Sequence, residues 1–155
     1  MSAEDAPVQI RAATSEDIAG WSRLRKLLWP EIVNSENLSE CTAILGDDSY
    51  GVFVSESDQR LTGFIEVRLR PFADGCDTSP VGYIEGWYVE PASRRSGIGR
   101  RLVAAGEQWA RSRDCVEMAS DALLENEDGR RAHEHLGYAE VEQAVRFRKD
   151  LRATP

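Results

Sequence analysis

A short loop between a strand-like run and a helix-like run constrains this chain more than any other segment. The run from Tyr83 to Glu90 is rich in β-forming residues and stops at Pro91, and apolar residues at helical spacing follow from Leu102. Between them lies Arg94 to Gly99, with the sequence R-R-S-G-I-G. A helix that begins after such a loop presents unpaired backbone N–H groups and a partial positive charge. The sequence therefore predicts an anion site, with a pyrophosphate as the expected ligand.

Two other phosphate-binding loops are excluded by their spacing. The chain contains no G-x-x-x-x-G-K-[ST] run, and Gly97 and Gly99 lack the third glycine of the dinucleotide fingerprint G-x-G-x-x-G. An ordinary strand–turn–helix connection with surface arginines remains the alternative interpretation.

Length and composition predict a single domain over residues 8–150, after an acidic tail of residues 1–7 that we expect to be disordered. No apolar stretch approaches the roughly 20 residues of a membrane span, and the tail lacks the apolar core of a signal peptide. The three cysteines form no C-x-x-C pair, which argues against a disulfide framework or a zinc site. We therefore expect a reducing, cytoplasmic setting, no metal, and a core position for Cys115.

The net charge of −8 disfavours nucleic acid as a partner, because phosphates attract a basic face. Four arginines at the loop and the following helix start are a local exception, and carboxylates gather before residue 41 and after residue 120. An anionic cofactor in one place and a cationic substrate in another would suit this polarity. A solvated acidic surface is the alternative.

Hydrophobic periodicity and turn residues predict ten elements and the connections between them. In chain order we expect a strand at Val8–Ala12, a helix from Ile18 to Trp29 after a cap at Thr14–Asp17, a helix within Glu36–Leu45, a hairpin of Tyr50–Ser55 and Leu61–Leu69, a loop at Pro71–Pro80, a strand at Val81–Val89, a helix at Gly97–Arg111, a strand at Val116–Ser120, a helix at Glu125–Leu136 ended by Gly137, and an extended segment at Tyr138–Arg148.

This order predicts an α/β (α+β) fold with a mixed central sheet and helices on both faces, since the strand–helix–strand unit around the loop requires a parallel pair. The Arg-x-x-Gly-x-Gly pattern of Arg94 to Gly99 resembles the acetyl-CoA loop of the GCN5-related N-acetyltransferases (GNAT), and the order of elements is similar to theirs.

Three further segments resemble one branch of that superfamily, the aminoglycoside 6′-N-acetyltransferases. These are Leu27–Trp29, Thr78–Val89, and Ala119–Leu123 together with Asn126, within a similarity that runs from about Ile10 to Arg148. The resemblance implies acetyl transfer from acetyl-CoA to the 6′-amine of an aminoglycoside antibiotic, by direct attack in a ternary complex.

The strand segment also makes chemical sense by itself. Strict alternation would place one set of side chains on one face of the strand, namely Val81, Tyr83, Glu85, Trp87 and Val89. Gly86, directly after Glu85, allows a bulge or a close backbone approach. Glu85 is then a lone carboxylate among aromatic residues, and a bound ammonium group would compensate its charge. The alternative is a glutamate paired with a neighbouring arginine.

By resemblance, Glu85 deprotonates the ammonium group through ordered water, and a backbone N–H near Val89 polarises the thioester oxygen. The loop would hold the pyrophosphate, and Asn126 would lie near the pantetheine or the thiol. The residues expected to bind acetyl-CoA are Trp87, Tyr88, Val89, Arg94, Arg95, Ser96, Gly97, Ile98, Gly99, Arg100 and Asn126.

The resemblance also assigns substrate contacts, three of them carboxylates that suit a polycationic aminocyclitol. They are Trp29, Phe72, Glu85, Asp121 and Glu142. Trp29 is equally expected as a core residue at a helix end, and Asp121 as a cap of the helix that follows it. Related enzymes often carry Tyr at the position of Phe72.

His133 stands where much of the superfamily has a tyrosine that protonates the leaving thiolate. It would donate that proton or only hydrogen-bond without a chemical role. The apolar Ala144, Val145 and Phe147 are consistent with a homodimer formed through the terminal segment. Two alternative functions remain: acetylation of another polycationic amine such as a polyamine or a peptide N-terminus, and a non-catalytic acyl-CoA-binding module.

Overall fold

The computed structural model describes residues 6–152, so most of the tail expected at residues 1–7 lies outside the described range. The chain divides after Asp121 into two compact units. The expectation of one domain over residues 8–150 stays a prediction. The elements are β1 (Gln9–Ala12), η1 (Ser15–Asp17), α1 (Ile18–Leu28), α2 (Asn34–Leu45), β2 (Tyr50–Ser57), β3 (Arg60–Arg70), β4 (Val81–Val89), η2 (Pro91–Ser93), α3 (Ile98–Ser112), β5 (Met118–Ser120) and α4 (Glu127–His135).

The first unit is built on a five-stranded sheet with the order β1-β2-β3-β4-β5. The first four strands are antiparallel, whereas β5 pairs with β4 in parallel through the crossover helix α3. The mixed sheet predicted from the order of elements is therefore confirmed.

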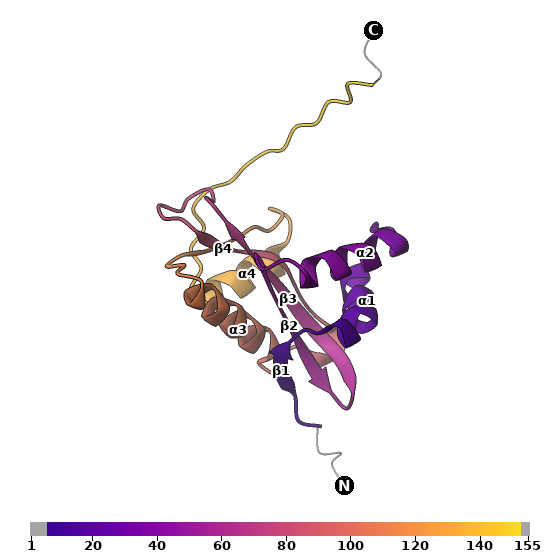
Figure 1. Cartoon of the computed structure of the whole chain (residues 1–155). Coiled ribbons are helices and arrows are strands. Elements are labelled where there is room, and N and C mark those ends of the chain that lie inside the picture. Colours follow the sequence, from indigo (N-terminus) through magenta and orange to yellow (C-terminus); the bar gives the residue numbers. More distant parts are fainter. Residues whose placement is uncertain (1–5, 153–155) are drawn as a thin grey trace. The chain divides into compact units, whose positions relative to one another are not determined.

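Helices cover both faces of this sheet (Figure 1). On one face, Trp21 and Leu24 of α1 pack with Phe64 in a cluster of fully buried side chains. Complete burial of an apolar side chain of this size stabilises the fold by about 1.5–3 kcal/mol. On the other face, Leu102 and Val103 of α3 are buried. The apolar residues at helical spacing thus form the core-facing stripes predicted from the sequence.

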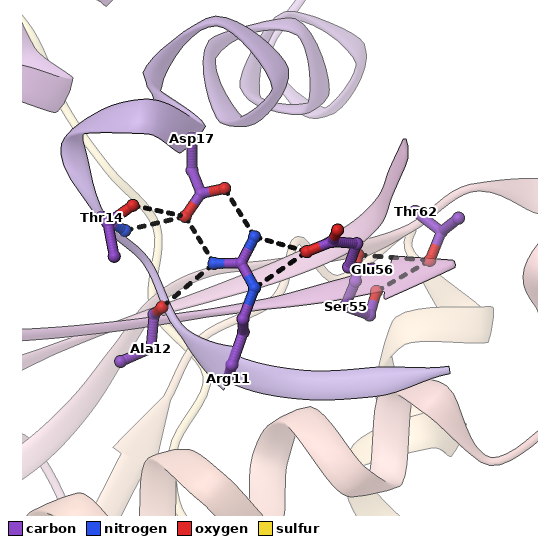
Figure 2. Close-up of polar contacts among 7 residues, drawn as sticks. All are labelled: Arg11, Ala12, Thr14, Asp17, Ser55, Glu56 and Thr62. Atoms are coloured by element: carbon purple, nitrogen blue, oxygen red, sulfur yellow. Dashed lines mark hydrogen bonds and ion pairs between the residues drawn. The ribbon is translucent and has the colours of Figure 1, made fainter. Parts of the chain in front are cut away.

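The start of α1 is fastened to the sheet by Arg11 of β1, as Figure 2 shows. The guanidinium donates to both carboxylate oxygens of Asp17, at 2.7 and 2.8 Å, and to Glu56 of β2 at 2.5 Å. The hydrogen bonds from Arg11 hold the pKa of Asp17 below its ordinary value, although burial opposes this. The backbone N–H of Thr14 also donates to Asp17, so the predicted cap is confirmed.

Three parts of the chain differ in detail from the expected structure. The β2–β3 hairpin is tighter, with a turn at Asp58 and Gln59, both in the left-handed region. β5 is shorter than predicted. The described residues 138–148 lie in no strand, because extended backbone without a hydrogen-bonded neighbour is not part of a sheet. At the end of α4, Gly137 has a φ of 89° and confirms the predicted helix stop.

A β-bulge in β4 overturns the prediction that five alternate residues share one face. Glu66 pairs with Gly86 and Val67 pairs with Ile84, which leaves Glu85 as the extra residue. Tyr83, Glu85 and Gly86 therefore all face the side of the sheet that α1 covers.

Beyond the bulge the alternation is inverted, so Trp87 lies on the opposite face, where a Cβ added to Gly99 of α3 would come within 3.2 Å of its ring. The bulge aims the carboxylate of Glu85 to one side of the sheet and the indole of Trp87 to the other.

Candidate active site

A pocket of about 590 Å³ opens on the face of the sheet covered by α1 and α2. Its walls come from both helices, from the segment after α2 and from strands β2 to β4. The lining residues are Arg25, Trp29, Ile32, Glu40, Ala43, Ile44, Asp47, Tyr50, Glu66 and Glu85. Four of them are carboxylates and one is an arginine, so negative charge is in excess among the lining residues.

The floor of the pocket contains a buried ion pair. Nε of Arg25 lies 2.7 Å from Oε1 of Glu66, and the indole N–H of Trp21 donates to the same oxygen at 2.9 Å. Burial raises the pKa of Glu66, while Arg25 and Trp21 act in the opposite direction. Arg25 also donates to Asn37 and Glu40 of α2, and therefore joins both helices to β3.

Trp29 directly follows α1, whose continuation is blocked by Pro30. Its ring meets Phe64 edge-on at 6.2 Å between centroids, and the guanidinium of Arg25 lies 5.1 Å from its centroid. A Cβ on Gly86 would come within 2.6 Å of the Trp29 ring, so a glycine is required there. Trp29 packs on the sheet, as the core interpretation expected, and also lines the pocket. Its contact with a substrate stays a prediction.

Glu85 is paired with an arginine, as the alternative interpretation expected. Nε of Arg70 donates to Oε1 at 2.9 Å and Nη2 donates to Oε2 at 2.8 Å. The side chains are 23% exposed for Glu85 and 37% for Arg70, so the carboxylate stays in reach of a ligand in the pocket.

Asp121 directly follows β5 and accepts a hydrogen bond from the hydroxyl of Tyr83. Burial and this carboxylate raise the pKa of Tyr83 above its ordinary value. The expectation that Asp121 caps the next helix is wrong, because α4 begins at Glu127 and Asn126 is its N-cap.

The other predicted substrate residues lie outside the pocket wall. Phe72 is 74% exposed in the loop between β3 and β4. Glu142 is an exposed residue of the second unit, in the extended segment that follows α4. Trp29 and Glu85 are thus the two predicted substrate residues that the pocket brings together.

The predicted anion loop has the backbone that such a site needs. Arg95 and Gly97 have φ values of 65° and 83°, and α3 begins directly afterwards. Nε of Arg94 donates to the carbonyl of Val89 at 2.7 Å, so this arginine anchors the loop to β4. α3 begins at Ile98, and the first N–H groups of an α-helix point out of its N-terminus, where they can receive an anion.

The strand that leads into this loop has one edge that β5 does not cover. Within residues 6–152, the β4–β5 pairing runs from Gly82 to Ile84 and stops there. From Glu85 to Val89, the side of β4 that would face β5 therefore offers strand-like hydrogen-bonding positions to an extended ligand. The predicted cofactor residues Trp87, Tyr88 and Val89 lie on this stretch.

In the second unit, the side chains of Asn126 and His133 both bond to the backbone of Gly129 in α4. The side-chain oxygen of Asn126 accepts from the N–H of Gly129 at 3.0 Å. Nδ1 of His133 lies 2.6 Å from the carbonyl oxygen of Gly129. Because a carbonyl oxygen can only accept a hydrogen bond, Nδ1 carries a proton. This contact supports a hydrogen-bonding role for His133 and leaves its chemical role a prediction.

The cysteines offer no activated thiol. Cys41 is fully buried, which raises its pKa to about 11, and Cys115 is 5% exposed, which confirms its predicted core position. Among the described residues, no group of three or more metal-ligating side chains could hold an ion. No helix in the described range combines the length and apolar character of a membrane span.

Sequence reasoning missed Arg25, Glu66 and Arg70 as parts of the site. A signal existed for the first two: Arg25 lies four residues after Trp21 on the apolar stripe of α1, and Glu66 interrupts the apolar run of β3. Charged residues at core positions are rarely buried without a partner, so the two could have been paired with each other.

Comparison with known proteins agrees with this architecture. The sequence model of the Acetyltransferase (GNAT) family matches residues 18–138. An aminoglycoside N(6′)-acetyltransferase type 1 from Stenotrophomonas maltophilia is 43% identical over 92% of this chain and 93% of its own length. Another, from Klebsiella aerogenes, is 38% identical over 95% of this chain and 99% of its own length.

A solved structure of AAC(6′)-Iy with the bisubstrate analogue CoA-S-monomethyl-acetylneamine superposes with a TM-score of 0.90 at 34% identity, covering 94% of this chain and 99% of that one. The fold, the family match and the extent of these similarities lead to one conclusion: the chain belongs to the GNAT acetyltransferase family, among the aminoglycoside N(6′)-acetyltransferases.

Proposed function

We propose that this protein transfers the acetyl group of acetyl-CoA to the 6′-amine of aminoglycoside antibiotics and so inactivates them. The observation that carries the proposal is the bulge in β4. The bulge directs the side chain of Glu85 into an acidic pocket, while the same strand continues, along a stretch that β5 does not pair with, to the predicted anion loop. An amine and an acyl donor can therefore meet on a single strand.

The acyl donor fits the strand and loop. Its pantetheine arm would pair with the backbone of Trp87 to Val89 as an added strand. Its pyrophosphate would lie at the N-terminus of α3, against the N–H groups of the segment Ser96 to Arg100. A similar protein supports CoA as the carrier of the acetyl group, since AAC(6′)-Iy was solved in complex with CoA. We expect Asn126 to lie near the pantetheine.

The amine would bind at Glu85, which removes its proton through an ordered water molecule. The neutral amine then attacks the thioester carbon directly, while a backbone N–H near Val89 polarises the thioester oxygen and stabilises the developing negative charge. A positioned base of this kind contributes about 10²–10⁴-fold to the rate. No acyl-enzyme is required, and the described cysteines with raised pKa values fit this scheme.

The remaining charges of the aminocyclitol would be held by carboxylates around the pocket. Trp29 offers its ring for stacking against a sugar, and Asp121 offers a second carboxylate. Contacts from Phe72 and Glu142, and proton donation by His133 to the thiolate, stay predictions on the same basis of family resemblance.

The terminal segment suggests how the protein assembles. Val145 and Phe147 are 78% and 93% exposed in an extended stretch that has no strand partner among the described residues. A second copy that covers them would form a homodimer. We expect the protein to act in the cytoplasm, where acetyl-CoA is made.

The direct test is an assay of CoA thiol release with acetyl-CoA and tobramycin or kanamycin. We expect turnover with aminoglycosides that carry a 6′-amine, and none with matched compounds that carry a 6′-hydroxyl. Turnover with spermidine or a basic peptide but with no aminoglycoside would overturn the substrate assignment. Absence of turnover with every amine, combined with measurable acetyl-CoA binding, would instead indicate a non-catalytic module.

A further inference from the structure

Arg70, the last residue of β3, touches two groups at once. Its guanidinium donates to both oxygens of Glu85, at 2.9 and 2.8 Å. Its central carbon also lies 3.5 Å from the centroid of the Tyr83 ring, which places the cation directly over the aromatic face. Arg70 is thus held from two sides by two residues of the neighbouring strand β4.

The contact continues from Tyr83 to the end of β5. The Tyr83 hydroxyl donates to the carboxylate of Asp121, and Tyr83 pairs with Ala119 in the parallel register of the two strands. A continuous path therefore links Glu85, Arg70, Tyr83 and Asp121 across β3, β4 and the residue after β5. Its two ends are carboxylates that the proposed function assigns to the amine and to the aminocyclitol.

A glutamate side chain has several rotatable bonds, so it needs such support to act as a base. The carboxylate must lie within about 2.6–3.2 Å of the amine or of an intervening water. A displacement of about 1 Å can lower the rate about 100-fold. A bidentate guanidinium fixes the plane of the carboxylate, which a lysine cannot do. An ionised carboxylate has about four acceptor positions, so two stay available for water or an ammonium group.

We propose that Arg70 is a positioning residue, which holds Glu85 in the orientation for proton removal and, through Tyr83, holds Asp121 at a set distance from it. This inference rests on the proposed function for the roles of the two carboxylates. Arg70 then maintains the distance between the carboxylates of Glu85 and Asp121. A substrate is selected when two of its ammonium groups are separated by a matching distance.

The test compares Arg70→Met, Arg70→Lys and Tyr83→Phe with the wild-type protein. We expect Arg70→Met to lower kcat for tobramycin about 10- to 100-fold and to leave the KM for acetyl-CoA within about twofold. Arg70→Lys should recover only a small part of the loss, because it restores the charge without the two-point contact.

Tyr83→Phe keeps the ring under Arg70 and removes only the contact with Asp121. It should raise the KM for tobramycin more than it lowers kcat. A merely structural role would not produce this split between the two variants. Thermal melting of each variant confirms that it is folded.

Three results would overturn the inference: wild-type kcat in Arg70→Met, a lower aminoglycoside KM in that variant, or full activity in Arg70→Lys. The first would show that Arg70 does not contribute to the rate, and the second would show that Arg70 competes with the ammonium group for Glu85. If the wild type turns over no aminoglycoside, the proposed function fails by itself. A crystal structure of Arg70→Met then decides the positioning, since an unchanged Glu85 carboxylate would contradict it.

Discussion

Two arginine–glutamate pairs contribute to the same pocket and differ chiefly in burial. Arg25 and Glu66 are 5% and 2% exposed, whereas Arg70 and Glu85 are 37% and 23% exposed. In both pairs the glutamate comes from the centre of the sheet, and the arginine donates through its Nε at 2.7 and 2.9 Å. The short distances are thus alike, and the surroundings differ.

Burial determines what each pair can do. Around Arg25 and Glu66, desolvation makes either charge very unfavourable without the other, so the pair acts as a fixed part of the core. Around Arg70 and Glu85, water or a ligand can replace part of each contact, so the carboxylate remains open to chemistry. In this pocket, the buried ion pair is therefore structural, and the ion pair that solvent reaches is open to chemistry.

The largest effect should come from Glu85→Gln, which keeps the shape of the side chain and removes its capacity to accept a proton. We expect kcat at neutral pH to fall about 10²–10⁴-fold, with acetyl-CoA affinity nearly intact. Steady-state kinetics and titration calorimetry measure the two quantities. Glu16→Gln, at an exposed carboxylate of η1, is the matched control. Near-normal turnover in Glu85→Gln would show that Glu85 is not the base.

The next largest effect concerns the free energy of unfolding when the arginine of each pair is replaced by methionine. Arg25→Met leaves Glu66 buried without its cation, and should lower the free energy of unfolding by about 3–5 kcal/mol. Arg70→Met should lower it by about 0–1 kcal/mol, as for other solvent-accessible pairs. Urea denaturation of both variants measures the difference. Equal losses in the two variants would remove the distinction drawn from burial.

The smallest effect is expected at a third ion pair, Arg11 and Asp17, whose burial is intermediate between the other two. The pKa of Asp17 is lowered in the folded protein, so its stabilising contribution is present above its unfolded value of about 3.9 and is lost as pH falls through the folded value. Asp17→Asn should therefore lower the free energy of unfolding by about 1.5–3 kcal/mol at pH 7.

Near pH 3 the difference between Asp17→Asn and the wild type should be smaller, since the wild-type carboxylate is then becoming protonated. Asp58→Asn, in the exposed β2–β3 turn, serves as the control. A loss of the same size at both pH values would show that the charge of Asp17 contributes nothing.

The conformation of the predicted anion loop could be inferred from the sequence because it is local. Gly97 permits the positive φ directly before α3, and Pro91 ends the strand pairing whatever the rest of the chain does. Helix periodicity likewise identified α1 and α3, since each buries a stripe that recurs every three or four residues.

The face of each β4 residue was not predictable from alternation. A bulge is a property of two paired strands, and neither β3 nor β4 alone specifies where the extra residue falls. Gly86 pointed to such a feature, but only its pairing with Glu66 of β3 makes Glu85 the extra residue.

The sequence by itself therefore determined the elements, the loop that suits a pyrophosphate, and the presence of Glu85 on the strand before it, because these depend on neighbours in the chain. Tertiary structure alone decided that Glu85 enters the pocket while Trp87 turns to the opposite face. Tertiary structure also decided that Arg25 pairs with Glu66 and that Arg70 pairs with Glu85. Pairings between charges far apart in the chain follow from strand register and burial, which no local pattern specifies.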